Sequence, residues 1–403
     1  MENKYCIHCL PTKRRTHLHA RIDFMVDHML VPFEAVSRFA ARTPMRNLSS
    51  LAGRGAVFVL SKLTVIRLAR DVDEEKILNR SLIFFREAQR RQLDVRALTF
   101  FGRPMNEYVL FANGRRHHYE CIPLKIRDPL IVNVDDKFRM KKLLADHAVP
   151  VAEGKRFYTA RRAYNYGMHL GFPLVVKPNG GSLSCHTFVD INSEEELARA
   201  IRDCRAYRPD IIVERFIRGP LYRATVIGQR KVYVCRRDRA NVVGDGDSTI
   251  RQLVEIKNAD ERRGKRGQPN VTLFEIPLDD VLERQLAQQA LNLDSVPDVG
   301  QVVLLQPKHI LSQGADVVNV IDDVHPENIQ LFLDIARLLQ TNLVGIDFIC
   351  PEVNQPHTGQ ECAVLEANSL PYIDMHAFPS HGRPEPVASD AWDIVLEDLE
   401  NTD

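Results

Sequence analysis

Glu366 and Asn368 lie one residue apart at the end of a short apolar run, residues 363–365. Along a β-strand, residues i and i+2 point to the same face, so this carboxylate and this amide share one. Asp347 is the only acid in a second apolar run, residues 343–349. A carboxylate inside such a run is costly unless it has a partner. Oxygen ligands without His or Cys are those that Mg²⁺ prefers.

The two runs are separated by a short segment that contains Pro and Gly, so we expect them to pair as antiparallel neighbours. Asp347, Glu366 and Asn368 would then converge on one point. Magnesium with few protein ligands often completes its shell with phosphate oxygens, which predicts a magnesium–nucleotide site. In the alternative, structural interpretation, Asp347 and Glu366 pair with buried arginines.

Two lysines favour the phosphate interpretation. Lys177 ends an apolar run and is followed by a Gly- and Ser-rich turn, residues 178–184, whose backbone N–H groups can form an anion-binding nest. A lysine adds a point charge to such a nest. Lys137 opens a helix, where an anion also meets the helix N-terminus. Such turns are common in loops, however, and Lys137 is equally well explained as a solvated surface residue.

The elements that position these residues follow a mixed α/β pattern. Periodicity and capping residues, among them Asp135 or Asp136 and the box Ser193-x-x-Glu196, predict helices over 72–93, 136–148, 160–170, 194–206 and 325–340. Strands are predicted over 94–101, 130–134, 172–178, 186–191, 210–217, 221–228, 230–237, 302–306, 343–350 and from 363. Asn113-Gly114 predicts a hairpin turn within 107–124. The Gly- and charge-rich segment 240–268 is expected to be a mobile surface loop that closes over bound substrate.

Composition and charge limit the class of protein. The chain of 403 residues, 27% charged and 7% aromatic, is that of an ordinary globular protein. Residues 1–130 hold 23 Lys and Arg against 13 Asp and Glu, whereas the remainder holds 31 against 40, which predicts a boundary near residue 130. A nucleic-acid-binding segment within residues 1–70 is a minor alternative, because no basic block is interleaved with aromatic residues.

The location that the sequence predicts is the cytoplasm. No apolar run reaches the roughly 18 residues of a membrane span, and the N-terminus has no apolar signal core. The eight cysteines are scattered, as expected for reduced thiols. Cys6 and Cys9, with His17 and His19, form a candidate zinc pattern, although the His spacing is unusual and a frayed terminus is the alternative.

The order of the motifs over roughly 130–395 resembles that of ATP-grasp ligases, specifically the ATP-grasp module of cyanophycin synthetase and of bifunctional glutathione synthetase. The most specific segments are VVGDG…IKNADERRG (242–264) and MHAFPSHG (375–382). The resemblance implies an α+β / α/β ATP-grasp fold over 131–403, with a smaller nucleotide lobe at about 140–218 and a larger lobe at about 219–400. A basic α/β lobe would precede it over 1–130, with its first 20 residues flexible.

The resemblance also implies roles for individual residues. Lys137 and Lys177 would contact the ATP phosphates. A small lid would cover the phosphates with Gly180, Gly181, Ser182 and Ser184. The hinge that binds adenine would be Glu214, Arg215, Phe216 and Ile217. Two magnesium ions would be held by Asp347, Glu366 and Asn368. Arg223 and Arg237 would be catalytic, Arg237 by neutralising charge on the transferring phosphoryl group, and Arg223 and His376 would face the acceptor substrate.

Three positions depart from the family pattern. Leu221 stands where an acid usually meets the ribose hydroxyls. Ser184-Cys185 replaces the second glycine of the small lid, and Gln306 replaces an arginine, with Lys308 and His309 as the alternative candidates for its role. The second, Mur-ligase-like module of cyanophycin synthetase also has no room in this sequence. We therefore expect a single amide bond to be formed rather than a polymer.

The sequence thus predicts an ADP-forming carboxylate–amine ligase that joins amino acids or small peptides through an acyl-phosphate. Its cofactors would be ATP and Mg²⁺, and its partners small-molecule substrates rather than membranes or nucleic acid. A homo-oligomer is compatible with this function. The alternative is an ATP-binding sensor or scaffold with weakened catalysis, which Leu221 and Gln306 motivate.

Overall fold

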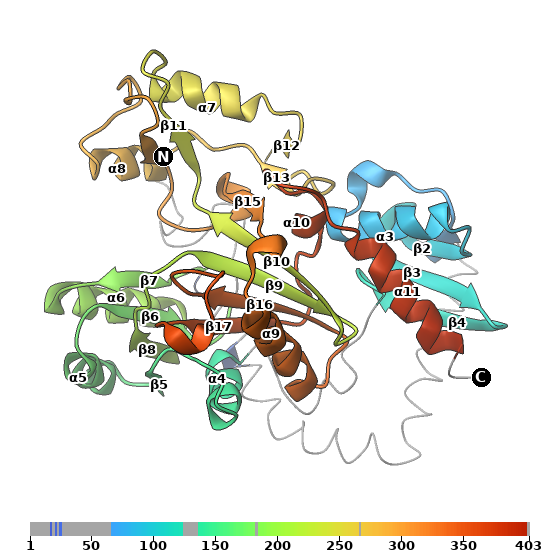
Figure 1. Cartoon of the computed structure of the whole chain (residues 1–403), viewed down its shortest axis with the longest axis horizontal. Coiled ribbons are helices and arrows are strands. Elements are labelled where there is room, and N and C mark those ends of the chain that lie inside the picture. Colours follow the sequence, from blue (N-terminus) through green and yellow to red (C-terminus); the bar gives the residue numbers. More distant parts are fainter. Residues whose placement is uncertain are drawn as a thin grey trace.

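A computed structural model describes residues 66–123, 136–181, 184–265 and 267–400, together with His17, Arg21, Phe24 and Met25. The predicted strand over 130–134, Cys6, Cys9 and His19 of the zinc pattern, and Ser182 of the lid lie outside the described residues. Within that part of the chain, three larger antiparallel sheets and two short two-stranded ones are arranged as in Figure 1.

The first sheet, in the order β1-β2-β3-β4, consists of β1 (Ile66–Ala69), β2 (Val95–Phe100), β3 (Arg103–Ala112) and β4 (Arg115–Glu120). The predicted hairpin is confirmed: Ala112 pairs with Arg115 across Asn113-Gly114, whose φ values of 50° and 68° suit a two-residue turn. The predicted helix over 72–93 is shorter than expected. A 3₁₀ turn, Glu74–Lys76, comes first, and α3 spans Asn79–Arg90.

The C-terminal helix α11 (Val387–Glu400) packs with α3 and the first sheet in one hydrophobic core. Trp392 of α11 is fully buried, and its Nε1 donates a hydrogen bond to the Phe84 carbonyl of α3 (2.9 Å). Figure 1 shows α11, in red, lying against the blue and cyan lobe. The first lobe therefore completes its core with residues from the other end of the chain.

The second sheet, in the order β5-β8-β6-β7, forms the smaller lobe from β5 (Gly154–Phe157), β6 (Leu174–Pro178), β7 (Phe188–Ile191) and β8 (Ile211–Arg215). Its core is shared with α5 (Ala160–Leu170) and α6 (Glu194–Tyr207). The helix α4 (Lys137–Asp146) leads into it, and the predicted cap is confirmed because Asp136 Oδ1 accepts a hydrogen bond from the Arg139 N–H (2.9 Å).

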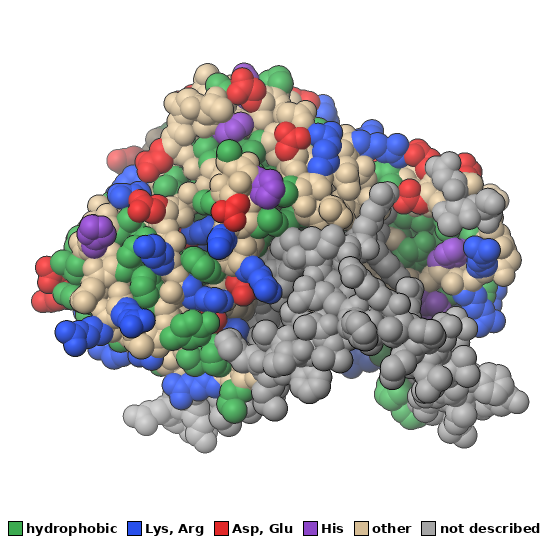
Figure 2. All heavy atoms as spheres, turned by 90° about the horizontal axis from the view of Figure 1, so that it is seen from below, with side chains coloured by type: hydrophobic (Ala, Val, Ile, Leu, Met, Phe, Trp, Pro, Cys, Tyr) green, Lys and Arg blue, Asp and Glu red, His purple; other side chains and the backbone are tan. Residues whose placement is uncertain are grey.

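Positive charge extends past the boundary predicted near residue 130. Residues 136–218 hold 15 Lys and Arg against 10 Asp and Glu, so the acidic excess lies later in the chain. Figure 2 shows Lys and Arg side chains gathered on the underside of the smaller lobe, at the left of that view. Such a surface attracts anions.

The central sheet has the order β15-β10-β9-β16-β17. Its strands are β9 (Leu221–Ile227), β10 (Lys231–Asp238), β15 (Asp316–Asn319), β16 (Leu343–Ile349) and β17 (Ala363–Asn368). The predicted antiparallel pairing of β16 with β17 is confirmed. The helix α9 (Pro326–Leu338) packs against one face, where Phe332 meets Phe348. The short helix α10 (Asp374–Ala377) follows β17.

The segment predicted as a loop contains a helix, so the loop prediction is wrong for residues 250–258, whereas the mobility of the segment and its closure over substrate stay predictions. This subdomain consists of β11 (Asn241–Val243), α7 (Ile250–Asn258), β12 (Arg263–Gly264), β13 (Leu273–Phe274), α8 (Asp280–Ala287) and β14 (Val302–Leu304). Thr249 and Gln252 form a reciprocal capping box that starts α7. Ile250 and Val254 then pack with Leu282 in a separate core. The glycines and charged residues around α7 favoured a loop prediction over the amphipathic helix that forms there.

The cysteines of the described part are all free and buried, which agrees with the prediction of unpaired thiols: Cys121, Cys185, Cys204, Cys235, Cys350 and Cys362. Among the described helices, none combines the length and apolar character that crossing a bilayer requires.

Candidate functional site

The predicted oxygen ligands share one face of the central sheet. Asp347 of β16 lies opposite Glu366 of β17 in the strand register, and Gly345 lies opposite Asn368. Ala367 packs on the other face, in the core under α9, so Glu366 and Asn368 point together as the sequence predicted. The register shifts by one residue beside Asp347, which leaves Leu365 as a bulge. Bulges of this kind often re-aim side chains beside functional sites.

Asp347 is held by the two predicted catalytic arginines. Arg223 Nε donates to Asp347 Oδ1 (2.5 Å), and Arg237 Nη2 donates to Oδ2 (2.7 Å). The side chains of Asp347, Arg223 and Arg237 are only 8%, 5% and 13% exposed. Burial alone would lower the pKa of the Arg223 guanidinium, but the neighbouring Asp347 carboxylate raises it above its ordinary value. For Asp347, the arginine pairing foreseen as the structural alternative is therefore present.

Glu366 has a lysine rather than an arginine as its partner. Its Oε2 lies 2.6 Å from Lys137 Nζ, and the two side chains are 29% and 18% exposed. Its Oε1 lies 3.4 Å from Asn368 Nδ2. Burial would raise the pKa of Glu366, but Lys137, followed by Arg223 and Lys177, holds it well below its ordinary value. The structure thus brings Lys137 to the face that carries the predicted metal ligands.

The donor set fits a magnesium ion. Two carboxylates and an amide oxygen are hard ligands, and each oxygen of Asp347 uses one lone pair for an arginine and keeps a second. Clusters of three or more His, Cys, Asp or Glu side chains suited to a metal are absent from the described residues. The predicted magnesium ligands do not form such a cluster, because only two of them, Asp347 and Glu366, are of these residue types and the third is Asn368.

The smaller lobe contributes a pair of lysines that share a buried glutamate. Glu214 of β8 accepts from Lys177 Nζ of β6 (2.6 Å) and from Lys141 Nζ of α4. Burial would raise the pKa of Glu214, but the two ammonium groups keep it below its ordinary value. The sequence interpretation missed Lys141, although it lies one helical turn after Lys137. Glu214, for which adenine binding stays a prediction, thus also holds Lys177, the lysine predicted to contact phosphate.

The turn after Lys177 is fixed to the start of α4. Asn179 Oδ1 accepts from the Phe138 N–H (2.9 Å), and Asn179 Nδ2 donates to Asp210 Oδ2 (3.1 Å). A Cβ on Gly180 would lie 2.7 Å from the Arg208 guanidinium carbon, so this position has little room for a side chain. Hydrogen bonds of Asn179 therefore link the start of α4, which carries Lys137, to the turn that follows Lys177.

The remaining predicted lid and hinge residues are described next. Gly181 has a φ of 105°, which favours glycine, and the Ser184 carbonyl accepts from Lys308 Nζ (2.7 Å). In the hinge, the Arg215 N–H donates to the Glu153 carbonyl and the Phe216 N–H to the Pro173 carbonyl. Those two backbone donors are already engaged, so a bound base would use other groups of the hinge, such as those of Ile217.

His376 lies on the same face of the central sheet as Arg223. Its Nε2 is 2.8 Å from Thr225 Oγ1, and Thr225 is two residues along β9 from Arg223. Burial, helped by the Arg223 charge, lowers the pKa of His376 to about 3, so its imidazole is neutral. Leu221, one of the departures from the family pattern, starts β9 opposite Arg237.

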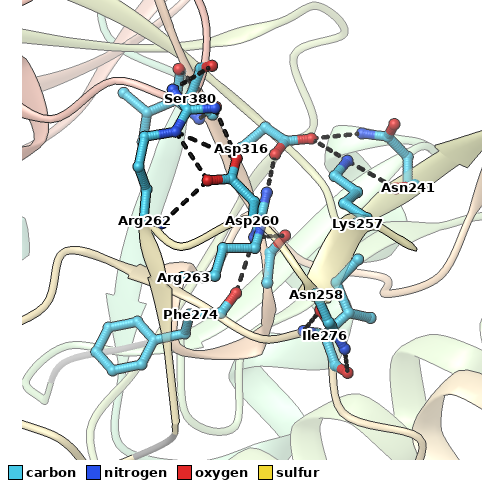
Figure 3. Close-up of polar contacts among 12 residues, drawn as sticks. Asn241, Lys257, Asn258, Asp260, Arg262, Arg263, Phe274, Ile276, Asp316 and Ser380 are labelled. Atoms are coloured by element: carbon cyan, nitrogen blue, oxygen red, sulfur yellow. Dashed lines mark hydrogen bonds and ion pairs between the residues drawn. The ribbon is translucent and has the colours of Figure 1, made fainter. Parts of the chain in front are cut away.

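The specific motif at 256–264 forms a polar network at the edge of the central sheet (Figure 3). Asp316 of β15 accepts from Lys257 Nζ (2.6 Å) and Asn241 Nδ2 (3.2 Å), and its other oxygen bonds Arg263. Arg262 donates to the Ser380 carbonyl (3.1 Å). We infer that the motif anchors the α7 subdomain to β15 and hence beside β10, which carries Arg237.

Asp316→Asn is expected to loosen this anchor. Lys257 and Arg263 would keep buried charges with no counter-charge from Asp316, and the free energy of unfolding should fall by about 3–5 kcal/mol. Asp334→Asn is the control, since Asp334 pairs with Arg337 on the surface of α9, outside this network, and should lose at most about 1 kcal/mol. Urea denaturation of both variants measures the difference. Equal losses would contradict an anchoring role for Asp316.

The fold that carries these groups is the ATP-grasp fold. A bifunctional glutathione synthetase from Pasteurella multocida superposes on 81% of this chain and 44% of that chain, with a TM-score of 0.62 at 23% sequence identity. The predicted fold class is therefore confirmed.

Sequence comparisons agree with the predicted resemblance. The family model described as D-ala D-ala ligase C-terminus matches residues 147–249. The chain is 34% identical to a cyanophycin synthetase of Crocosphaera subtropica over 265 residues, 65% of this chain and 30% of that protein. It is 29% identical to the Geminocystis herdmanii cyanophycin synthetase over 374 residues, 91% of this chain and 42% of that protein. The bifunctional protein GshAB of Pasteurella multocida is 27% identical over 300 residues, 73% and 38% of the two chains.

The chain thus spans less than half the length of these curated relatives. The similarity that covers 91% of the chain also extends well before residue 130, where no motif had indicated it.

Proposed function

We propose that the chain is an ADP-forming carboxylate–amine ligase. A carboxylate oxygen of the first substrate attacks the γ-phosphorus of ATP, and ADP leaves. The amine nitrogen of the second substrate then attacks the acyl carbon, loses a proton and displaces inorganic phosphate, which forms an amide. The observation that supports this most is the gathering of Asp347, Glu366, Arg223, Arg237 and Lys137 on one sheet face.

The cations of the site suit phosphoryl transfer, whose transition state spreads negative charge over oxygens. Lys137 and Lys177 supply positive charge from α4 and β6, and Arg237 from β10. Arg237 is held in place by Asp347, so little reorganisation is needed when charge develops. Magnesium held by Asp347, Glu366 and Asn368 would neutralise charge between the β- and γ-phosphates. ATP and Mg²⁺ are the proposed cofactors.

A screen for ADP release tests the proposal. Pairs of amino acids and dipeptides are incubated with Mg²⁺-ATP, and release should require both a free carboxylate and a free amine. Arg237→Met should reduce the rate of the active pair by about 10²–10³-fold, because it removes a preorganised charge. Arg230→Met is the control, since Arg230 pairs with Glu397 at the surface.

Two other outcomes are informative. Binding of Mg²⁺-ATP without ADP release from any pair would favour the sensor or scaffold function. Failure to bind Mg²⁺-ATP at all would exclude both functions.

A further inference from the structure

A line of hydrogen bonds runs from Asp347 to the turn predicted as the small lid. Arg237 Nη2 donates to Asp347 Oδ2 (2.7 Å), and the Arg237 carbonyl lies 2.5 Å from His309 Nδ1. The preceding residue, Lys308, donates through Nζ to the Ser184 carbonyl (2.7 Å). The segment that follows β14 therefore connects β10 of the central sheet to the smaller lobe.

Of the two candidates for the role of the replaced arginine, Lys308 is better suited to bind an anion. Burial, helped by the charges of Arg237 and Arg239, lowers the pKa of His309 to about 4, so its imidazole is neutral at neutral pH. Burial also lowers the pKa of Lys308, an effect that a bound anion would oppose. Among the described residues its ammonium group bonds the Ser184 carbonyl alone, which leaves two of its three N–H donors for a ligand.

Arg239, two residues after Arg237, is a half-buried cation without a counter-charge. Burial lowers its pKa, and no carboxylate of the described residues opposes that effect. The adjacent Asp238 pairs instead with Arg236, over 2.7 and 2.8 Å. Arg237 Nε is itself buried and has no partner within the described part of the chain. Cationic donors left in this state are unfavourable unless an anion binds to them.

Gln306 adds an amide group that lacks any partner. The strands β11 and β14 pair antiparallel, and just beyond their ends the Leu305 N–H donates to the Ala240 carbonyl (2.8 Å). The next pair in this register is Arg239 with Gln306, whose side chains then point to the same side. Gln306 is 0% exposed, and neither Nε2 nor Oε1 has a hydrogen-bond partner among the described residues. A buried amide in this state marks an incomplete site.

We propose that Arg239 and Lys308 bind the phosphoryl group that ATP transfers, and that the Gln306 amide donates to it as well. These groups flank the line of bonds that joins Asp347, a predicted magnesium ligand, to the lid. Phosphoryl transfer spreads negative charge over three oxygens, which suits several donors on separate segments. The inference rests on the proposed ligase function and places on two other residues the charge that the family pattern expects at position 306.

The test is a thermal-unfolding assay of the full chain with Mg²⁺-ADP, with and without orthovanadate, which imitates a phosphoryl group in transfer. Orthovanadate should raise the melting temperature beyond its value with Mg²⁺-ADP alone, because it binds only the native state. Arg239→Met and Lys308→Met should each weaken the apparent affinity for orthovanadate by about 10- to 100-fold, the range for one charged hydrogen bond.

Further variants separate a ligand contact from a structural role. Adding Gln306→Arg to Arg239→Met returns a positive charge opposite the position that lost it, and should recover most of the lost affinity. Lys308→Arg keeps the charge and should keep the affinity. Arg251→Met is the control, because Arg251 is exposed on α7, and it should behave as the unmodified chain. Arg239→Gln and Lys308→Gln replace the Met variants if these do not unfold cooperatively.

Several results would overturn the proposal. They are the absence of any orthovanadate effect on the unmodified chain, unchanged affinity in both Met variants, and no recovery when Gln306→Arg is added. The Mg²⁺-ADP shift separates the two proposals. If that shift is present and the orthovanadate shift absent, only the phosphoryl contacts are excluded, whereas absence of the Mg²⁺-ADP shift excludes the ligase function.

Discussion

Glu366→Gln should leave the fold intact and reduce ATP turnover at least about 100-fold. Removing a residue that only supports a metal ligand costs up to about 100-fold in activity, and removing a ligand itself should cost no less. The side chains of Glu366 and Lys137 are 29% and 18% exposed, so water still reaches Lys137 in the variant, and the stability loss should stay below the cost of breaking a fully buried pair, about 3–5 kcal/mol. Turnover should depend on Glu366 more strongly, because the variant removes a proposed magnesium ligand and the carboxylate charge that pairs with Lys137. The melting temperature and the rate of ADP release are measured on the same preparation.

Glu397→Gln is the control for this variant, since Glu397 pairs with the surface residue Arg230. It should change neither quantity. Extensive unfolding of Glu366→Gln, with full specific activity in its folded fraction, would show that Glu366 is structural rather than a metal ligand.

Asp347→Asn should affect both stability and turnover. Arg223 and Arg237 would retain buried charges with no counter-charge from Asp347, and losing one partner of a buried pair costs about 3–5 kcal/mol. Guanidinium denaturation measures this loss, and the ADP assay should show no turnover above background.

A second substitution identifies the cause. Adding Arg223→Met to Asp347→Asn removes one of the two uncompensated charges and should recover part of the lost stability. A stability loss below about 1 kcal/mol in Asp347→Asn would be the result for an exposed pair and would contradict the burial of this cluster.

The part of the site that sequence reasoning placed correctly rests on short-range geometry. Strand periodicity put Glu366 and Asn368 on one face, and the short connection between two apolar runs paired them with Asp347. Both follow from the fixed alternation of side chains along a strand. The partners of these residues come from elsewhere in the chain. Lys137 is 229 residues from Glu366, and no local pattern reports such a contact.

The same limit applies to the fold. Asn113-Gly114 and the Asp136 cap act within a few residues and were predicted from them. The ion pairs of Glu214 with Lys141 and Lys177 depend on the packing of α4 against the sheet, so no local pattern predicted them; the nucleotide contact of Glu214 stays a prediction. In α7, charged and polar residues separate the apolar ones, which obscured the helix in the sequence. The capping box of Thr249 and Gln252 marks where the helix begins.

The packing of α11 on α3 has a consequence for synthesis of the chain on the ribosome. Phe84 and Trp392 are 308 residues apart, so the first lobe is translated long before the helix that completes its core. Until α11 is synthesised, Trp392 cannot cover the apolar surface around Phe84, so that surface must be solvated or covered by other contacts. Non-local closure of this kind slows folding. It also leaves apolar surface of the nascent first lobe exposed, and such surface is prone to aggregation until the core is complete.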